Sequence, residues 1–189
     1  TATGKLASLH IEKSRGEMDL EQRIARVEQQ LRTSRDREAV WQLMARYAKA
    51  VDEEDDVALA AIVSEDVTCE TVPWSKGRVF EGRDSFVRLF KGYQRTFVNR
   101  KRFITNEILE FTDENNATGW SNWLVVHARD GESYIGWGSY DWGFSRASGD
   151  WLINKFVVHV DRMTTLAQGW ADAQSQLAEF PREQKVRPE

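Results

Sequence analysis

The hydrophobic periodicity of this chain changes near residue 100, and that change restricts the possible folds more than any other feature. Before it, apolar residues recur every three or four positions, which predicts helices; after it they alternate, which predicts strands. The segments between the alternating runs are short and turn-like, as at Asp130-Gly131. We therefore expect successive hairpins that form an antiparallel meander. Its four strands are expected at residues 101–112, 117–129, 133–146 and 150–162.

Helical patterns dominate the first hundred residues. Apolar stripes, meaning apolar side chains that recur on one face, predict helices over 20–31, 40–51 and 84–97. The segment from Thr33 to Glu38 carries no such stripe. We therefore expect a break there between the first two helices.

Shorter elements connect these helices to the meander. A short helix is expected over 57–62, where Asp55 or Asp56 can cap its first turn. Short strands are expected at 66–71 and 78–81, with a loop between them. Helices followed by a long curved sheet indicate an α+β fold. We expect an α+β barrel or cone in which the antiparallel sheet wraps around the N-terminal helices.

The 189 residues suit one domain with appendages. Residues 1–17 show no regular period and are expected to form a flexible arm, and residues 18–162 to form the domain. Residues 163–189 are expected to form an amphipathic helix and a tail. That helix could cross a subunit boundary, cover a pocket mouth or dock on its own subunit. The stripe within 20–31 spans only two heptads, so we expect it to pack on its own domain or on a neighbouring subunit rather than in a coiled coil.

Composition excludes several classes of function. The net charge of −4 argues against non-specific nucleic-acid binding, and no apolar run is long enough for a membrane span. The N-terminal stretch lacks a long apolar segment, so no secretory signal is expected, and the single Cys69 suits a reducing cytoplasm. Three histidines without a Cys/His cluster predict no metal site. Eight tryptophans and nine phenylalanines could line a pocket for a flat apolar ligand.

The stretch LMARYAKAVDEEDD, residues 43–56, contains the best candidate for chemistry. Asp52 follows Tyr47 by five residues, a little over one helical turn. Both side chains could reach the edge of an interior cavity, where a carboxylate and a phenol could form an acid/base site. The alternative is that Asp52 opens a turn and Tyr47 belongs to the core.

Two strings carry a resemblance to the SnoaL-like, nuclear transport factor two-like superfamily. LMARYAKAVDEEDDVALAAIVSEDV at 43–67 resembles the opening of bile-acid dehydratases, scytalone dehydratase relatives and hexachlorocyclohexane dehydrochlorinases. KRFITNEILEF at 101–111 is similar to a strand of the same family. The resemblance covers about residues 20–162 and implies a cystatin-like cone and a homo-oligomer, with a trimer favoured. The same cone also hosts isomerases, cyclases, hydrolases and binding modules, so it does not define the activity.

The resemblance also implies roles for particular residues. Asp52 falls on the family's catalytic aspartate, and Tyr47 falls where several dehydratases keep a pocket tyrosine. Arg102 stands where the family normally has the dyad histidine, and arginine cannot act as a base because it stays protonated. Either Arg102 holds an anionic or phenolic oxygen, or pairs with Asp52 while Asp52 acts as base, or His127 replaces the missing histidine.

Strand alternation, aligned with the dehydrochlorinase-like members, adds substrate-binding candidates. It turns Trp123 and His127 into the cavity and His159 away from it. On the next two strands it turns Tyr140, Trp142 and Phe156 inward. Trp74, in the loop that contains Pro73, could act as a lid.

We hypothesise a cofactor-independent lyase, a dehydratase or a formaldehyde-releasing lyase. Its substrate would be an aromatic or polycyclic hydroxylated small molecule, such as a lignin-derived diaryl propanediol. One alternative is an isomerase or cyclase of polyketide- or terpenoid-like intermediates. The other is a non-catalytic module that binds a small molecule.

Overall fold

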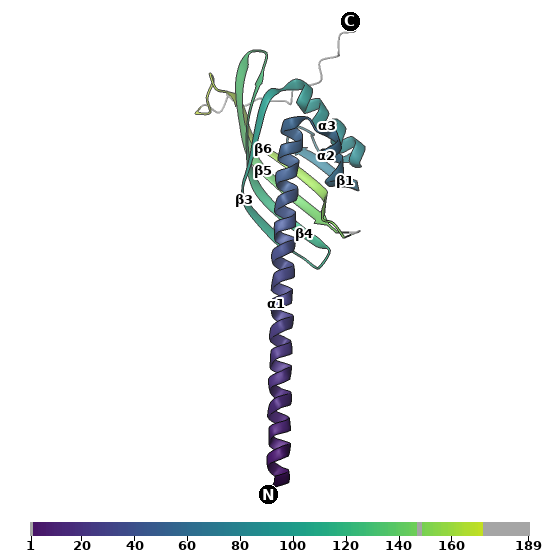
Figure 1. The fold of residues 1–189 in the computed structure, drawn as a ribbon. Coiled ribbons are helices and arrows are strands. Elements are labelled where there is room, and N and C mark those ends of the chain that lie inside the picture. Colours follow the sequence, from purple (N-terminus) through teal and green to yellow (C-terminus); the bar gives the residue numbers. More distant parts are fainter. Residues whose placement is uncertain (1, 147–148, 172–189) are drawn as a thin grey trace. The chain divides into compact units, whose positions relative to one another are not determined.

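The computed structural model describes residues 2–146 and 149–171, with side chains described from residue 19 onward. The chain divides into two compact units, with the boundary between Ala39 and Val40. No helix in the described ranges is both long enough and apolar enough to cross a membrane. The elements shown in Figure 1 are α1 (Ala2–Glu53), α2 (Asp56–Ala61), β1 (Val63–Val72), β2 (Phe80–Glu81), α3 (Arg83–Thr96), β3 (Val98–Phe111), β4 (Asn116–Arg129), β5 (Glu132–Ser145) and β6 (Leu152–Thr165).

The first unit consists of α1 residues. Residues 2–17, for which an arm is expected, are helical. The predicted break from Thr33 to Glu38 is wrong, because these residues are helical too. Residues 17–53 contain neither glycine nor proline, and the Thr33 hydroxyl donates a hydrogen bond of 3.0 Å to the carbonyl oxygen of Gln29. Loss of the apolar stripe therefore did not end the helix, since polar side chains of this kind are compatible with it.

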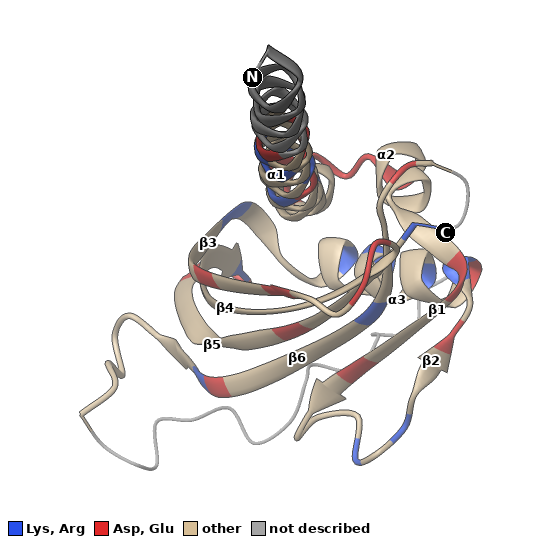
Figure 2. Cartoon of the chain, turned by 90° about the horizontal axis from the view of Figure 1, so that it is seen from below, with Lys and Arg blue, Asp and Glu red and all other residues tan. Residues whose placement is uncertain are grey.

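The second unit is built on one curved, unclosed sheet of six strands in the order β2-β1-β6-β5-β4-β3. Strands β3 to β6 form the predicted antiparallel meander, so the expected α+β class is confirmed. β1 pairs with β6 in parallel and with β2 in the antiparallel direction. The parallel pairing joins the first strand of the second unit to the last strand of the meander, and it extends the meander into the full sheet (Figure 2).

Irregular pairing bends the sheet. The β5–β6 register shifts between Trp137 and Gly138, and the β3–β4 register shifts between Thr105 and Ile108. A Cβ atom at Gly138 would lie 1.9 Å from the carbonyl oxygen of His159, so only glycine allows the two strands to approach there. Such bulges increase local twist and bending.

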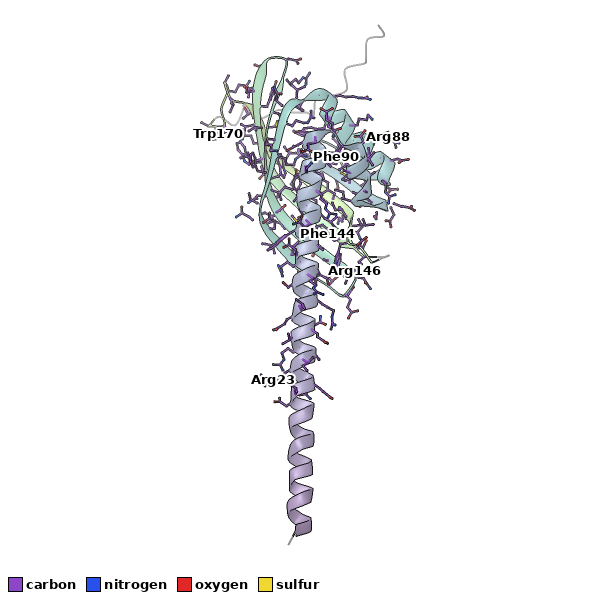
Figure 3. All side chains as sticks on the ribbon, viewed as in Figure 1. Arg23, Arg88, Phe90, Phe144, Arg146 and Trp170 are labelled. Atoms are coloured by element: carbon purple, nitrogen blue, oxygen red, sulfur yellow. The ribbon has the colours of Figure 1, made fainter. Side chains whose placement is uncertain are left out.

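The last turns of α1 and the helix α3 lie on the concave face of the sheet (Figure 2). Tyr47 of α1 and Phe156 of β6 are fully buried, and their ring centroids are 4.9 Å apart. Phe90 of α3 and Phe144 of β5, labelled in Figure 3, are also buried. The core is therefore a largely aromatic layer between the helices and the sheet.

Strand β4 alternates as predicted. Its inward side chains are buried, namely Ser121, Trp123, Val125 and His127. Its other face is exposed, at Trp120, Leu124 and Val126.

The acidic run after Asp52 forms a turn and a cap. The Asp55 carboxylate accepts a hydrogen bond of 2.9 Å from the Ala58 backbone N–H and so caps α2. The Asp56 carboxylate lies 2.7 Å from Lys91 Nζ, which ties α2 to α3. Figure 2 shows the acids of this run in red where α1 leads into α2.

Strand β6 continues to Thr165, into the segment for which a C-terminal helix is expected. The next residues form a hydrogen-bonded turn rather than a helix, since Thr164 Oγ1 donates to the Gly169 carbonyl oxygen at 2.8 Å. The rest of the expected helix, from residue 172 onward, lies outside the described residues.

Candidate active site

A cavity of about 60 Å³ lies within the second unit, between its helices and the concave face of the sheet. Its walls are mostly apolar, but three tyrosines and one arginine also reach it. They come from α1, α3, β3 and β5, so packing of the helices on the sheet creates the site. The lining residues are Tyr47, Thr71, Trp74, Leu89, Phe90, Tyr93, Arg102, Trp123, Val125, Tyr140, Val158, Val160 and Met163.

Tyr47 is held rigidly in this cavity. Its ring packs edge-on against Phe90 at 5.4 Å and against Trp142 at 5.5 Å between centroids. The hydroxyl group is buried and forms no hydrogen bond of regular geometry within the described residues, but it lies close enough to the Tyr140 hydroxyl for each to affect the pKa of the other. Burial raises the pKa of Tyr47 well above its ordinary value, which the nearby Arg102 opposes. Tyr47 therefore stays protonated and can offer a proton in a hydrogen bond.

Tyr140 lies across the cavity from α1, on β5. Burial raises the pKa of Tyr140, again against the effect of Arg102. The Trp123 ring stacks on Tyr140 at 5.8 Å between centroids. Trp123 Nε1 donates to the carbonyl oxygens of Ser139 and His159, at 3.2 Å and 3.1 Å. These two bonds orient the indole, so the Trp123 and Tyr140 rings form a fixed wall.

Arg102 is a buried cation among aromatic rings. Its guanidinium carbon lies 5.4 Å from the ring centroid of Tyr47 and 5.3 Å from that of Tyr93, within the range of cation–π attraction. Burial opposes the charge, whereas the tyrosine oxygens and Asp52 favour it, and the pKa of Arg102 stays above its ordinary value. Nε and Nη1 are buried without a hydrogen-bond partner in the part of the chain that the structure describes.

Two unpaired donors on a buried cation are energetically costly. An unsatisfied buried polar group costs roughly 1–3 kcal/mol, and more when it is charged. An acceptor that enters the cavity would relieve this cost. The arrangement therefore favours a ligand with an anionic or phenolic oxygen.

Asp52 lies on the other side of Arg102. Its Oδ2 accepts a hydrogen bond of 3.1 Å from the backbone N–H of Arg102 and lies 3.7 Å from Lys101 Nζ. Its Oδ1 is buried and has no partner among the side chains and backbone described. Asp52 lines an open groove between α1 and β3, together with Trp41, Lys101 and Arg102. Arg102 thus borders both spaces, the groove with Asp52 and the cavity with Tyr47.

His127 lies behind Tyr93. Its Nδ1 is 2.9 Å from the Tyr93 hydroxyl, and its ring stacks on Phe97 at 3.8 Å between centroids. Burial, followed by the charges of Arg102 and Arg100, lowers the pKa of His127 to about 3. The imidazole is therefore neutral at physiological pH. His127 reaches the cavity only through Tyr93.

The other candidates divide between cavity and core. Trp74, from the loop after β1, lines the cavity. Trp142 and Phe156 surround Tyr47, and Trp142 Nε1 donates to Ser121 Oγ at 2.9 Å. Tyr93 is a site residue that the sequence analysis did not single out. It lies on the apolar face of the helix predicted over 84–97, where residue type alone does not separate a pocket tyrosine from a core one.

In the described ranges, no group of three or more His, Cys, Asp or Glu side chains is placed to hold a metal ion. The polar side chains that line the cavity include three phenols, one guanidinium and the Thr71 hydroxyl.

Comparison with known proteins identifies the family. Residues 32–157 match the SnoaL-like domain, and the chain belongs to this family. A scytalone dehydratase-like protein of Novosphingobium aromaticivorans DSM 12444 is similar in structure, with a TM-score of 0.64 and 21% identity over 70% of this chain and 89% of that chain. Hexachlorocyclohexane dehydrochlorinase LinA-type3 of Novosphingobium barchaimii LL02 has a TM-score of 0.67 and 20% identity over 73% and 94%.

A protein of unknown function from Mycobacterium tuberculosis is also similar, with a TM-score of 0.58 and 26% identity over 66% of this chain and 70% of that chain. No curated protein matches the chain. At these identities the dehydratase-like protein and the dehydrochlorinase share the fold with this chain. Only the chemistry of the site itself therefore indicates an activity.

Proposed function

We propose that this protein is a cofactor-independent lyase that removes water from an aromatic or polycyclic hydroxylated small molecule. The observation that carries the proposal is the juxtaposition of two Arg102 donors, Nε and Nη1, that have no partner among the described residues with the buried hydroxyl groups of Tyr47 and Tyr140. Aromatic walls suit a flat substrate, and a buried guanidinium suits a phenolic or anionic oxygen. The SnoaL-like family and its dehydratase and dehydrochlorinase neighbours support the same class.

In this mechanism Arg102 anchors the substrate oxyanion. Asp52 is the base, or it orients the base. Its Oδ2 is held by the Arg102 N–H, which leaves Oδ1 to accept a proton. Because Asp52 lies on the groove side of Arg102, the substrate carbon that loses its proton has to reach past the Arg102 guanidinium. The electron pair of the broken C–H bond forms the new double bond, and the hydroxyl group departs. Tyr47 and Tyr140, which stay protonated, donate hydrogen bonds to the departing oxygen. The proton and the hydroxide leave together as water, so no electrons are exchanged with a cofactor.

His127 is the second candidate to complete the site with Asp52. The neutral imidazole could accept a proton through Tyr93, to which its Nδ1 is hydrogen-bonded. The pKa of about 3 makes it a weak base, which favours Asp52 for proton removal.

Substrate entry requires side chains to move. The cavity of about 60 Å³ is smaller than the roughly 150 Å³ that a benzene ring needs. We propose that Trp74 acts as the lid, because it lines the cavity from a loop rather than from the sheet. Trp123 then supplies apolar contact to the bound ring, while Trp142 and Phe156 support Tyr47 from the core.

Release of formaldehyde is a variant of the same elimination. In a diaryl propanediol, the base would take the proton of the terminal hydroxyl group instead of a C–H proton. The C–C bond then breaks, its electron pair forms the double bond, and the neighbouring hydroxyl group departs as water. Formaldehyde, water and a diaryl alkene account for every atom. The aromatic walls and Arg102, as a phenol-holding cation, support this variant.

The test is turnover of hydroxylated aromatic compounds, including aromatic diols, followed by mass spectrometry. We expect products that have lost water, or water and formaldehyde. Asp52→Asn should reduce turnover by at least roughly a hundredfold, the usual range for general acid–base groups. Asp56→Asn is the matched control, because Asp56 pairs with Lys91 on the surface. Full activity in Asp52→Asn would remove Asp52 from the mechanism.

An isomerase or cyclase of polyketide- or terpenoid-like intermediates is the alternative reaction. It would leave the substrate mass unchanged, so the same measurement separates it from a lyase. A non-catalytic binding module is the other alternative, since Arg102 stands where the family has histidine. Activity that appears only in Arg102→His would identify such a degenerate enzyme.

Assembly and location are proposals of the same kind. The resemblance to the dehydratases supports a trimer, which the mass of the purified protein in solution can test. The buried free thiol of Cys69 suits a reducing compartment, so we propose the cytoplasm.

A further inference from the structure

The first unit carries an exposed apolar stripe that the proposed activity does not use. Four large apolar side chains, spaced four, three and four residues apart, are between 49% and 61% exposed. Residues at this spacing share one face of a helix. They are Leu20, Ile24, Val27 and Leu31.

This spacing is the heptad pattern of a coiled coil, with Ile24 and Leu31 at a positions and Leu20 and Val27 at d positions. We call the row of a and d positions the seam. Its next positions on either side of the stripe are polar, namely Lys13 and Glu17 before it and Ser34 and Glu38 after it. A shift by one heptad would bring Lys13 against Leu20. In-register pairing alone matches all four apolar side chains with apolar partners.

The flanking charges select a direction. Arg23, labelled in Figure 3, is at a g position, and Glu21 and Glu28 are at e positions. In a parallel pair a g residue faces the e residue five positions later on the partner, so Arg23 faces Glu28 of the second copy. In an antiparallel pair e residues face each other, and Glu21 meets Glu28 of the second copy. The charges attract in the parallel arrangement and repel in the antiparallel one.

We propose that residues 20–31 bind the same segment of a second copy of this chain, in parallel and in register. The paired surface is about 17 Å long at 1.5 Å per residue and covers only two heptads of α1, so the association is weak and depends on concentration. It is independent of the proposed activity, because it uses none of the residues around the cavity.

Single cysteine variants of the full chain test the geometry directly. Leu20→Cys and Leu31→Cys place a thiol at each end of the seam, while the native Cys69 is only 1% exposed and does not compete. Under mild oxidation we expect each variant alone to form a disulfide-linked dimer on a non-reducing gel. Gln22→Cys, on the outer face of the same turn, is the control and should stay monomeric on that gel.

Three results would overturn the proposal. Cross-linking only in a mixture of the two seam variants would indicate an antiparallel pair. Equal cross-linking of Gln22→Cys would indicate random collision. Absence of cross-linking in either seam variant at high micromolar concentration would show that the stripe does not pair.

Charge and mass measurements provide an independent test. Arg23→Glu should reduce the cross-linking yield of Leu31→Cys roughly two- to fivefold, and Glu28→Arg in the same chain should restore it. Ile24→Asp with Val27→Asp should lower the average mass in sedimentation at high concentration. The matched control, Ala25→Asp with Gln29→Asp, adds the same charge outside the seam and should not. Equal masses for the two double variants would contradict the proposal.

Discussion

Two segments of α1 carry apolar stripes, but the two stripes have different surroundings. In residues 40–51 the stripe includes Tyr47 and Val51, which are completely buried in the core of the second unit. In residues 20–31 the stripe includes Val27, which is 61% exposed. Periodicity thus predicts that a segment is helical and amphipathic, but it does not identify what covers the apolar face. Substitutions in the two stripes can test this difference in burial.

Tyr47→Ala should lower the free energy of unfolding by about 3–5 kcal/mol, because it removes a fully buried ring that packs against four others. Leu31→Ala, in the exposed stripe, should change it by less than about 0.5 kcal/mol in dilute solution. Urea denaturation followed by tryptophan fluorescence measures both. A small effect of Tyr47→Ala would mean that the core reorganises around the lost ring.

A valine pair compares the two stripes with the same chemical change. Val51→Ala should cost about 2 kcal/mol, since it deletes two buried methyl groups. Val27→Ala should be neutral or slightly stabilising, because alanine has the higher helix propensity. Thermal unfolding of dilute protein measures the difference. Equal effects of the two substitutions would show that Val27 is less exposed in solution than it is in the single chain.

Acid should destabilise the second unit through His127. The folded pKa of about 3 lies below the ordinary value of 6.5, so between these values the unfolded chain binds a proton that the native chain does not. Stability therefore falls as the pH falls from about 6.5 towards 3, by about 2 kcal/mol at pH 5. His127→Gln should flatten this dependence in urea midpoints measured from pH 7 to pH 4. If the urea midpoint depended on pH as strongly in this variant, groups other than His127 would cause the dependence.

Arg102→Met should raise the free energy of unfolding by about 1 kcal/mol, because an apolar side chain of similar length removes two buried donors that have no partner among the described residues. The same substitution should abolish binding of phenolic ligands, measured by calorimetry. Gain of stability with loss of binding is the behaviour of a residue retained for function. A loss of more than about 1 kcal/mol would instead make Arg102 a structural residue.

Much of the second unit could be predicted from local patterns. Alternation located the meander and divided the β4 side chains into two sets, because successive side chains of a strand point to opposite faces. The resemblance to the dehydrochlorinase-like members then indicated which set is buried. Residue type and position restricted the cap of the short helix to Asp55 or Asp56, and the structure shows that Asp55 caps α2. The break from Thr33 to Glu38 was predicted incorrectly, since the absence of an apolar stripe was taken for the end of a helix.

The site was less accessible to such patterns. The sequence suggested Asp52 and Arg102 as possible partners. It did not show that Arg102 borders both the cavity and the groove, or that Asp52 lies in the groove. The position of His127 behind Tyr93 depends on how α3 packs on β4. No local pattern contains these distances, because they join residues from different elements.

Within the second unit, the sequence alone determined the short helix, the helix α3, the antiparallel meander and their order, and its short strings indicated the SnoaL-like family and the inward face of β4. These properties follow from the periods of neighbouring residues and from short strings. The tertiary structure decided the parallel pairing of β1 with β6, the small size of the cavity and the separation of Asp52 from Tyr47 by Arg102. The physical reason is that alternation specifies which side of an element is buried, whereas packing across elements decides which side chains meet there and how much space they leave.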